Sequence, residues 1–339
     1  MIRLLPEWHP QWGVMLAWPH PDTDWKPLLP RAEHTYSAIA RAILAQENLL
    51  LLCRDAQHEA HIRQLLGNDL PGQRLHCRHV RYNDTWARDF GPLTVADNNA
   101  TAATAQLRDF TFNGWGNKFV ASDDNRVTQQ LDWTVPVQSV PLVLEGGSVE
   151  INSRGQLLTT RQCLLNPNRN PQLDQAAIEA ALREHLGATD IWWLSHGDLE
   201  GDDTDAHIDT LARFCDDSTI AYVQCDNSED SHYPALQRME KELQQLAQRE
   251  QLSLLPLPLP APQYDEEGQR LPATYANFLI INGAVLMPTY DCDSDEAAVA
   301  QLARAFPQHK IVPIPCLPLT WQHGSLHCVT MQLPEGVTV

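Results

Sequence analysis

The sequence predicts an α/β fold built from a repeated unit of helix and strand. Amphipathic helical patterns begin near Gln172, Tyr233 and Asp295, so their starts lie 61 and 62 residues apart. Each is followed by a short apolar strand, such as IWWLS from Ile191 and IVPIP from Ile311. A fixed interval of this kind is typical of repeated supersecondary units rather than of one doubly wound sheet. About five such units would fill the 339 residues.

The beginning of the chain fits this pattern, whereas its second quarter is less regular. Residues Arg31 to Gln46 are predicted as a helix with one apolar face that leads into a strand at 49–53. The second and third units are expected within residues 84–170, with turns at Asn98-Asn99 and Arg154-Gly155. Asn282-Gly283, which lies between NFLII and AVLMP, predicts a hairpin because this dipeptide readily supplies two positive φ angles.

The composition excludes several classes of protein. The chain has 43% hydrophobic residues, and its 24 basic against 43 acidic side chains give a net charge of −19. This charge repels nucleic acid and attracts small cations. No apolar run approaches the ~20 residues of a membrane span, and no signal-peptide pattern is present, so we expect a cytoplasmic protein without a membrane partner. The eight cysteines form no CxxC pair, which predicts reduced thiols and no zinc knuckle.

The densest group of chemically active residues is an acidic segment in the middle of the chain. Six carboxylates fall within residues 198–209, an arrangement that requires solvation or a bound cation. A calcium loop fits poorly, because Asp203 stands where glycine is required and Asp209 where glutamate is required. A solvated acidic turn remains the alternative. In a strand running from Ile208 to Phe214, the side chains of His207 and Asp209 would share one face.

Four further clusters carry candidate site residues. DTWARDFGP contains Trp86 and Asp89, which by itself fits an Arg–Asp surface pair beside a buried tryptophan. FNGWGN brackets Trp115 with glycines, and LEGGS places two glycines after Glu145. QHGSLHCVT holds Cys328, whose neighbour His327 would point to the opposite face of a strand. His207 is therefore the better candidate for activating a Cys328 thiol.

Taken together and in order, these segments resemble the agmatine deiminase family of guanidine-modifying enzymes. The resemblance covers nearly the whole chain, from PEWHPQWGVMLAWPHPDTDW through DTWARDFGP, FNGWGNKF, LEGGSVEI, LLTTRQCLLNPNRNP, GDDTDAHIDTLARF and LPATYANFLIINGAVLMPTYD to HGSLHCVTMQ. It implies a five-bladed pseudo-symmetric α/β propeller of ββαβ units, the pentein fold, forming a single catalytic domain over residues 1–339. It also implies a homo-oligomer, by analogy with relatives.

The resemblance implies a role for each matching residue. Cys328 corresponds to the nucleophile, His207 to the general acid and base, and Asp89 and Asp209 to the carboxylates that bind the guanidinium group. Glu145 corresponds to an acidic residue that lines the site and orients His207, while Trp86 and Trp115 are expected beside the substrate. Paired carboxylates hold a planar guanidinium in place, and a thiolate is the softest available nucleophile. The implied reaction is hydrolysis of agmatine to N-carbamoylputrescine and ammonia through a covalent thiouronium intermediate, with no metal or organic cofactor.

The rival interpretations differ mainly in substrate. Free arginine and peptidyl arginine are the alternatives, and an arginine enzyme needs a cation that pairs with the α-carboxylate. The acidic segment favours agmatine, with Asp202 or Asp203 facing its ammonium group. A catalytically silent polyamine-binding or guanidinium-binding protein is the non-enzyme alternative. Two departures affect substrate preference: Ala206 stands where most relatives have glycine, and residues 322–325 replace a run of glycines.

Overall fold

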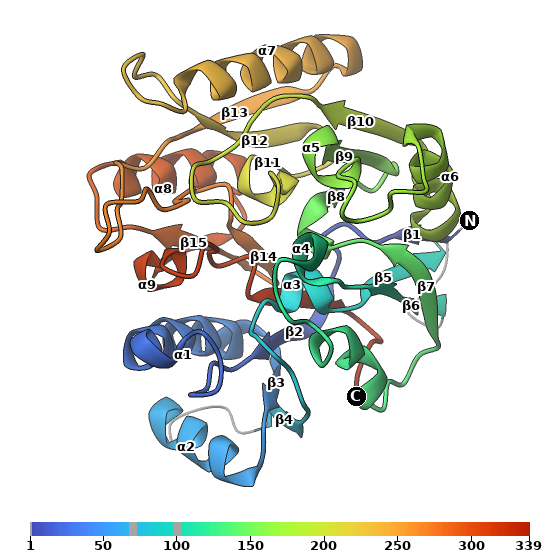
Figure 1. Cartoon of the computed structure of the whole chain (residues 1–339), viewed down its shortest axis with the longest axis vertical. Helices are drawn as coiled ribbons and strands as arrows, with labels where there is room; N and C mark the ends of the chain where they lie inside the picture. The colour runs from blue at the N-terminus through green and yellow to red at the C-terminus, as the bar shows by residue number, and fades with distance from the viewer. Residues whose placement is uncertain (1, 68–72, 98–103) are drawn as a thin grey trace.

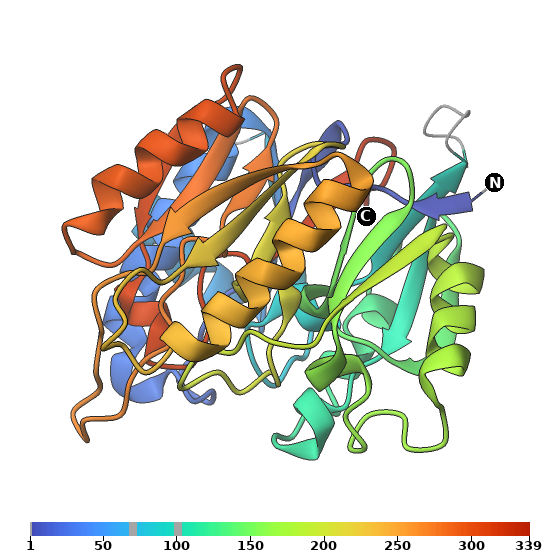
Figure 2. The same cartoon turned by 90° about the horizontal axis from the view of Figure 1, so that it is seen from above.

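The computed structural model describes residues 2–67, 73–97 and 104–339, and these residues form five small β-sheets. Figure 1 shows the five sheets following one another around a common centre, with the long helices at the perimeter and the short helices α3 and α4 near the middle. The view from above shows α6, α7 and α8 on the outside of their strands (Figure 2). The described part of the chain therefore forms a five-bladed α/β propeller.

Three successive sheets are built on the same ββαβ plan. In each, the first two strands are antiparallel and the second and third are parallel, joined through a helix. The elements are β8 (Val149–Ile151), β9 (Gln156–Thr160), α6 (Gln175–Leu186) and β10 (Asp190–Leu194); β11 (Ala212–Phe214), β12 (Thr219–Gln224), α7 (Tyr233–Glu250) and β13 (Ser253–Pro258); β14 (Leu279–Ile281), β15 (Ala284–Thr289), α8 (Ser294–Ala305) and β16 (Lys310–Pro315). These are the repeating units that the sequence predicts.

The two ends of the chain close the ring. The C-terminal strand pairs antiparallel with β2 in the sheet β17-β2-β3-β4, and β1 pairs with β5 in the sheet β1-β5-β6-β7. The strands of the first of these sheets are β2 (Gln11–Ala17), β3 (Asn48–Cys53), β4 (Leu75–His79) and β17 (Thr330–Pro334). The helices α1 (Leu29–Gln46) and α2 (Ala56–Leu66) connect β2 to β3 and β3 to β4. The second comprises β1 (Ile2–Leu4), β5 (Leu93–Asp97), β6 (Gln106–Thr111) and β7 (Val137–Val143).

Short helices occupy the connections, including those that carry the site. They are α3 (Ala87–Phe90), α4 (Gly114–Asn117), α5 (Arg161–Leu164), α9 (Leu317–Thr320) and the 3₁₀ turns η1 (Lys26–Leu28), η3 (Asp124–Arg126), η4 (Thr128–Gln130), η5 (Gly146–Ser148) and η6 (Ile208–Thr210). In the second sheet η3 and η4 stand in place of the long crossover helix. None of the helices in the described ranges is long and apolar enough to cross a membrane.

Local sequence explains why the long helices form. The apolar face of α7 is buried at Leu236, Met239, Leu243 and Leu246, a spacing of three or four residues that keeps them on one side. The N-terminus of α6 is capped by the Asp174 carboxylate, which accepts a hydrogen bond from the Ala177 amide at 2.9 Å. Each helix thus contributes one buried face, and α8 packs against β13 of the preceding sheet as well as β16 of its own.

Several local predictions can be compared with the structure. The hairpin at Asn282-Gly283 and the turn at Arg154-Gly155 are confirmed, although only Gly283 of the first pair has a positive φ (74°). The predicted Asn98-Asn99 turn lies outside the described residues. The strand predicted over residues 208–214 is wrong in its first half, because residues 208–210 form η6 and only 212–214 form β11.

Candidate active site

A pocket at the centre of the propeller contains the cysteine that the sequence singles out. Its lining combines one thiol, four carboxylates and a wall of aromatic rings. The residues are Asp24, Asp84, Trp86, Asp89, Trp115, Phe119, Asp203, Thr204, Gln322, His323, Gly324 and Cys328. Five residues predicted to form the site therefore share one pocket, although they come from distant parts of the chain.

The aromatic wall is shaped by close packing. Trp115 makes edge-on contacts with Trp86 and Phe119, with ring centroids 6.5 and 5.6 Å apart. Gly324 lies against Trp86 so closely that an added Cβ would stand 2.1 Å from the indole ring. The glycine in the loop before Cys328 is thus required for the loop to lie against this wall.

Cys328 is held by an asparagine from another blade. The Asn277 Oδ1 atom accepts a hydrogen bond from the His327 amide at 2.8 Å and lies 3.4 Å from the Cys328 Sγ atom. Burial raises the pKa of the Cys328 thiol well above its usual value, and the negative charges of Asp209 and Asp89 raise it further. In the absence of a cation in the pocket, Cys328 is therefore a neutral thiol.

Three other predicted residues meet at Gly147 of η5. A Cβ atom added there would lie 2.6 Å from His207 Nδ1, 2.9 Å from Asp89 Oδ1 and 3.0 Å from Asp209 Oδ2. The Gly147 amide donates a hydrogen bond to Asp89 Oδ1 at 3.0 Å. The structure thus brings His207, Asp89 and Asp209 together around one glycine, and the glycine leaves the space that they occupy.

Asp89 is buried but well supplied with hydrogen-bond donors. Besides the Gly147 amide, the Trp115 indole donates to its Oδ2 at 2.9 Å, and the His207 ring lies 3.6 Å from its Oδ1. Burial raises the pKa of Asp89 to about 6, although the charge of His207 lowers it. At neutral pH the side chain is therefore predominantly a carboxylate.

His207 has an unusual environment for a buried histidine. Both ring nitrogens lack a hydrogen-bond partner within the described part of the chain, although the side chain is only 1% exposed. Burial lowers its pKa, but the negative charge of Asp89, together with interactions with Cys163 and Glu145, outweighs that effect and raises it to about 10. The resting ring is thus an imidazolium with free N–H groups that can give up a proton.

Asp209 is oriented by the histidine that sequence reasoning set aside. His327 approaches Asp209 Oδ2 with Nδ1 at 2.7 Å and Glu7 Oε2 with Nε2 at 2.6 Å. Both partners are carboxylates, so both ring nitrogens act as donors. Burial raises the pKa of Asp209, but the hydrogen bond and charge of His327, together with the charges of His207 and Arg213, outweigh this and lower it overall. The second oxygen, Oδ1, has no hydrogen-bond partner among the described residues and can accept a hydrogen bond from a ligand.

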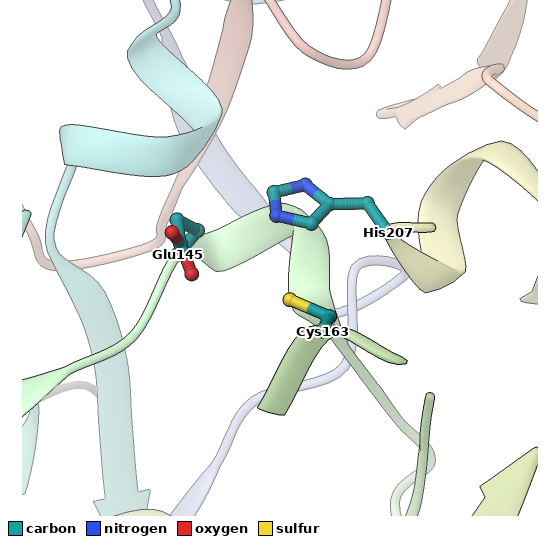
Figure 3. A group of neighbouring side chains, drawn as sticks. All are labelled: Glu145, Cys163 and His207. Atoms are coloured by element: carbon teal, nitrogen blue, oxygen red, sulfur yellow. The ribbon is translucent and has the colours of Figure 1, made fainter. Parts of the chain in front are cut away.

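Glu145 lies behind His207 rather than in the pocket wall. Its two oxygens accept hydrogen bonds from Arg169 Nε at 2.9 and 3.0 Å, in a fully buried pair. Figure 3 shows Glu145, Cys163 and His207 pointing toward one another, and their ligand atoms all lie within 4.8 Å of each other. Glu145 is thus close enough to influence His207 electrostatically, but it makes no hydrogen bond to the ring.

The two acidic residues predicted to meet the far end of a substrate behave differently. Asp203 lines the pocket, and its side chain is 41% exposed. Asp202 does not line it, because its oxygens accept hydrogen bonds from the Thr204 amide at 3.0 Å and from the Ala206 amide at 2.7 Å. This loop also places Asp205 and Ala206 at positive φ (65° and 63°), so Ala206 occupies a conformation that glycine adopts more easily.

Sequence reasoning missed several residues that position the site. Asn277, Cys163 and Arg169 all lie within segments that carry the family resemblance, yet nothing local distinguishes them from residues of the core. Glu7 and Asp24 lie in the first segment that carries the family resemblance, residues 6–25, but nothing local marks either side chain as reaching the site. Their roles depend on contacts between blades, which a reading of neighbouring residues does not include.

Comparison with solved structures first identifies the class. The chain matches DDAH from Pseudomonas aeruginosa with a TM-score of 0.51 and 11% identity, covering 96% of this chain and 100% of the other. It matches an amidinotransferase from Microseira wollei with a TM-score of 0.52 and 11% identity, covering 98% and 96%. These similarities establish the fold alone, which is the pentein fold.

Closer relatives establish the family. Residues 3–334 match the model of the Porphyromonas-type peptidyl-arginine deiminases. Agmatine deiminase of Stutzerimonas stutzeri is 31% identical over 97% of this chain and 94% of its own length. A solved agmatine deiminase from C. jejuni with substrate bound is 38% identical, with a TM-score of 0.91 and coverage of 99% and 97%. A structure from Porphyromonas gingivalis, provisionally named an arginine deiminase, is 45% identical over both full lengths, with a TM-score of 0.92. The chain belongs to the agmatine deiminase family.

Proposed function

We propose that this chain, acting as a single catalytic domain, hydrolyses agmatine to N-carbamoylputrescine and ammonia. The observation that carries the proposal is the lining of the pocket that holds Cys328. Four carboxylates, Asp24, Asp84, Asp89 and Asp203, line it, and no Arg or Lys is among the described residues that do. A ligand that is cationic at both ends fits this lining. We infer that the product serves the supply of putrescine and polyamines.

The guanidinium end would lie over Cys328. Asp89 and the free Oδ1 of Asp209 would each accept N–H bonds from the planar group and fix its carbon near the sulfur. Because the charges of Asp209 and Asp89 raise the pKa of Cys328, a cation bound between them would lower it again. The substrate itself would thus favour formation of the thiolate that attacks it, and the thiol proton would leave to the solvent because His207 is already protonated.

His207 would serve as acid and then as base. The Cys328 thiolate adds to the guanidinium carbon, and the His207 imidazolium protonates the departing nitrogen so that ammonia leaves. A thiouronium remains on the sulfur. The now neutral His207 takes a proton from water as the water adds to that carbon. The C–S bond then breaks to regenerate the thiolate, and the added hydroxyl gives its proton to the solvent, where ammonia takes it up, so that the neutral ureido product leaves.

The rest of the pocket supports agmatine over arginine. The aliphatic chain would lie against Trp86, Trp115 and Phe119, and the terminal ammonium would lie near Asp24 and Asp203. Arginine carries a carboxylate at that position, and the acidic lining would repel it. Similar proteins are named as deiminases of arginine, of peptidyl arginine and of agmatine, so the proposed preference for agmatine rests on the pocket of this chain.

The direct test is to measure ureido product with agmatine, free arginine and a blocked arginyl peptide. We expect turnover of agmatine, with kcat/KM exceeding that for arginine by at least about 100-fold, which corresponds to about 3 kcal/mol. Cys328→Ala should abolish turnover with the fold intact, as judged by circular dichroism. A preference for arginine would refute the substrate, and failure to convert any of the three would refute the reaction.

The ammonium subsite can be tested separately with butylguanidine, which lacks the ammonium group. The double variant Asp24→Asn/Asp203→Asn should lower kcat/KM for agmatine by about tenfold, a modest effect because Asp203 is partly exposed to solvent. Turnover of butylguanidine by the same variant should be unchanged within about twofold. An equal loss for both compounds would contradict the assigned subsite.

A further inference from the structure

We propose that Cys163, His207 and Glu145 form an inhibitory binding site for a divalent transition-metal ion such as Zn²⁺. One thiol, one imidazole and one carboxylate place their ligand atoms within 4.8 Å of each other, and no other such group of three occurs in the described residues. The three come from separate segments: Cys163 from α5, Glu145 from the start of η5, and His207 from the start of η6. The proposal goes beyond deimination, since binding of the ion does not depend on the reaction.

The ligand set is one that Zn²⁺ prefers. Zinc takes Cys sulfur at about 2.3 Å and His nitrogen or carboxylate oxygen at about 2.0–2.2 Å, which places tetrahedral ligand atoms about 3.5 Å apart. Small rotations of the three side chains would bring their ligand atoms from within 4.8 Å of each other to this spacing of about 3.5 Å. A fourth position is left for water or for Asp89, whose Oδ1 lies 3.6 Å from the His207 ring.

The unpartnered atoms of His207 point independently to a ligand. The ring is almost completely buried, yet neither nitrogen has a hydrogen-bond partner within the described residues. Buried polar atoms are normally satisfied, so an unpartnered imidazole facing a thiol and a carboxylate is suited to accept an ion. Figure 3 shows the ring directed at the other two side chains.

Charge balance also permits the ion. Glu145 is already neutralised by Arg169, and its oxygens retain lone pairs after accepting the two Arg169 bonds. A divalent ion bound to neutral His207 and deprotonated Cys163 carries a net charge of +1, which the Asp89 carboxylate offsets. On binding, the ion displaces the thiol proton of Cys163 and the second proton of the His207 imidazolium.

Occupancy would inhibit the enzyme. A nitrogen bonded to Zn²⁺ cannot carry the proton that His207 is proposed to deliver to the leaving group. All three ligands are buried and none of them lines the pocket, so the ion would have to pass Asp89, which lines it and lies 3.6 Å from the His207 ring. Inhibition should therefore develop slowly rather than within the mixing time.

Cobalt(II) provides a test that does not depend on activity. Titration of the whole protein should yield one Co²⁺ per chain, with a thiolate-to-cobalt absorption band in the near ultraviolet. The band should persist in Cys328→Ala and disappear in Cys163→Ser, while Cys225→Ser, a buried cysteine elsewhere, serves as the matched control. Calorimetry with Zn²⁺ should show affinity lower by at least about 100-fold in Cys163→Ser than in Cys225→Ser.

Two results would overturn the proposal. One is the absence of a thiolate band in the wild-type protein, and the other is a band lost in Cys328→Ala but retained in Cys163→Ser, which would place the ion on the nucleophile. If Cys163→Ser does not fold, His207→Asn in the Cys328→Ala background should abolish the band, and its persistence there would refute the site. Agmatine turnover measured with chelator present tests the proposed function separately, so the two can fail independently.

Discussion

At the scale of single residues, the reactivity of Cys328 depends on charges that are not adjacent to it in sequence. Burial together with Asp209 and Asp89 holds the pKa of the thiol far above neutrality. The same two carboxylates would bind the positively charged group of the substrate. The resting protein should therefore protect this thiol from reagents that need a thiolate.

Alkylation of Cys328 by iodoacetamide should be slow at neutral pH and should keep accelerating with pH past 9 without reaching a plateau. Asp209→Asn removes one of the negative charges that disfavour the thiolate, so it should lower the pKa of Cys328 and speed the reaction at pH 8 by about tenfold. Mass spectrometry of the peptide containing Cys328 separates this thiol from the other seven. A plateau below pH 7.5 in the wild-type protein would contradict the assigned protonation state.

Gly147 offers a second residue-scale test. The methyl group of Gly147→Ala would displace His207, Asp89 and Asp209, since its Cβ would lie 2.6 to 3.0 Å from an atom of each. A displacement of about 1 Å at such a site costs about 100-fold in rate, and we expect at least that loss in kcat for agmatine. Gly268→Asn is the control, because Gly268 has open space around it and asparagine tolerates its positive φ. Retention of more than a tenth of wild-type kcat in Gly147→Ala would show that the three side chains need not converge there.

At the scale of elements, the regular repeats could be predicted and the irregular ones could not. The helix and strand period is visible because α6, α7 and α8 each have one apolar face and a short strand rich in apolar residues after them. The second unit has no such signal, because η3 and η4 replace the long helix. The strand predicted at His207 gives way to a 3₁₀ turn because Thr204 Oγ1 accepts the His207 amide at 3.1 Å and Thr210 Oγ1 donates to the His207 carbonyl at 2.8 Å.

The loop before η6 supplies a prediction at this scale. Asp202 holds the loop through the amides of Thr204 and Ala206, so Asp202→Ala should loosen the segment that positions His207. We expect the free energy of unfolding to fall by about 1–2 kcal/mol. We also expect kcat/KM to fall about tenfold, and by the same factor for agmatine and for butylguanidine. A loss confined to agmatine would instead make Asp202 part of the ammonium subsite.

At the scale of the whole molecule, one buried carboxylate connects the blades. Glu7 lies in the connection between β1 and β2, where it accepts hydrogen bonds from the Ile280 amide of β14 at 2.7 Å and from His327 at 2.6 Å. It pairs with Arg88 of α3 at 3.3 Å and with Arg213 of β11 at 3.0 Å. Arg213 in turn pairs with Glu150 of β8. The five sheets thus meet in one ionic network, and His327 links this network to Asp209 in the site.

Cys328, His207, Asp89 and Asp209 could be proposed as site residues from sequence because each lies in a motif that carries the family resemblance, and their proximity is what the structure adds. The network beneath these residues could not be proposed in this way. Glu7 is a single acidic residue in a stretch without helical or strand periodicity, and its partners lie 81 to 320 positions away. Glu7 and its partners come together only when the five sheets close into the propeller, so no local sequence pattern predicts the contact.

Glu7→Gln should therefore be among the most destabilising conservative changes in the chain. The change removes the negative charge of Glu7 while Arg88, Arg213 and His327 stay buried. The free energy of unfolding should fall by about 3–5 kcal/mol at pH 7. Glu250→Gln is the matched control, since its exposed pair with Arg249 should contribute less than about 1 kcal/mol. Unfolding should be measured in urea, because guanidinium is the group that the pocket is proposed to bind.

The difference in unfolding free energy between the wild-type protein and Glu7→Gln should depend on pH in the direction set by the pKa shift of Glu7. Burial raises the pKa of Glu7, but Arg213, His327 and Arg88 together lower it well below its usual range. A carboxyl whose pKa is depressed in the folded state contributes stability above its unfolded pKa of about 4.5, and this contribution is lost as the pH falls. The gap in unfolding free energy between the wild-type protein and Glu7→Gln should therefore be constant from pH 7 to about 5 and narrow below that. A gap that widens toward acid, or one smaller than about 1 kcal/mol at pH 7, would mean that Glu7 does not hold the blades together.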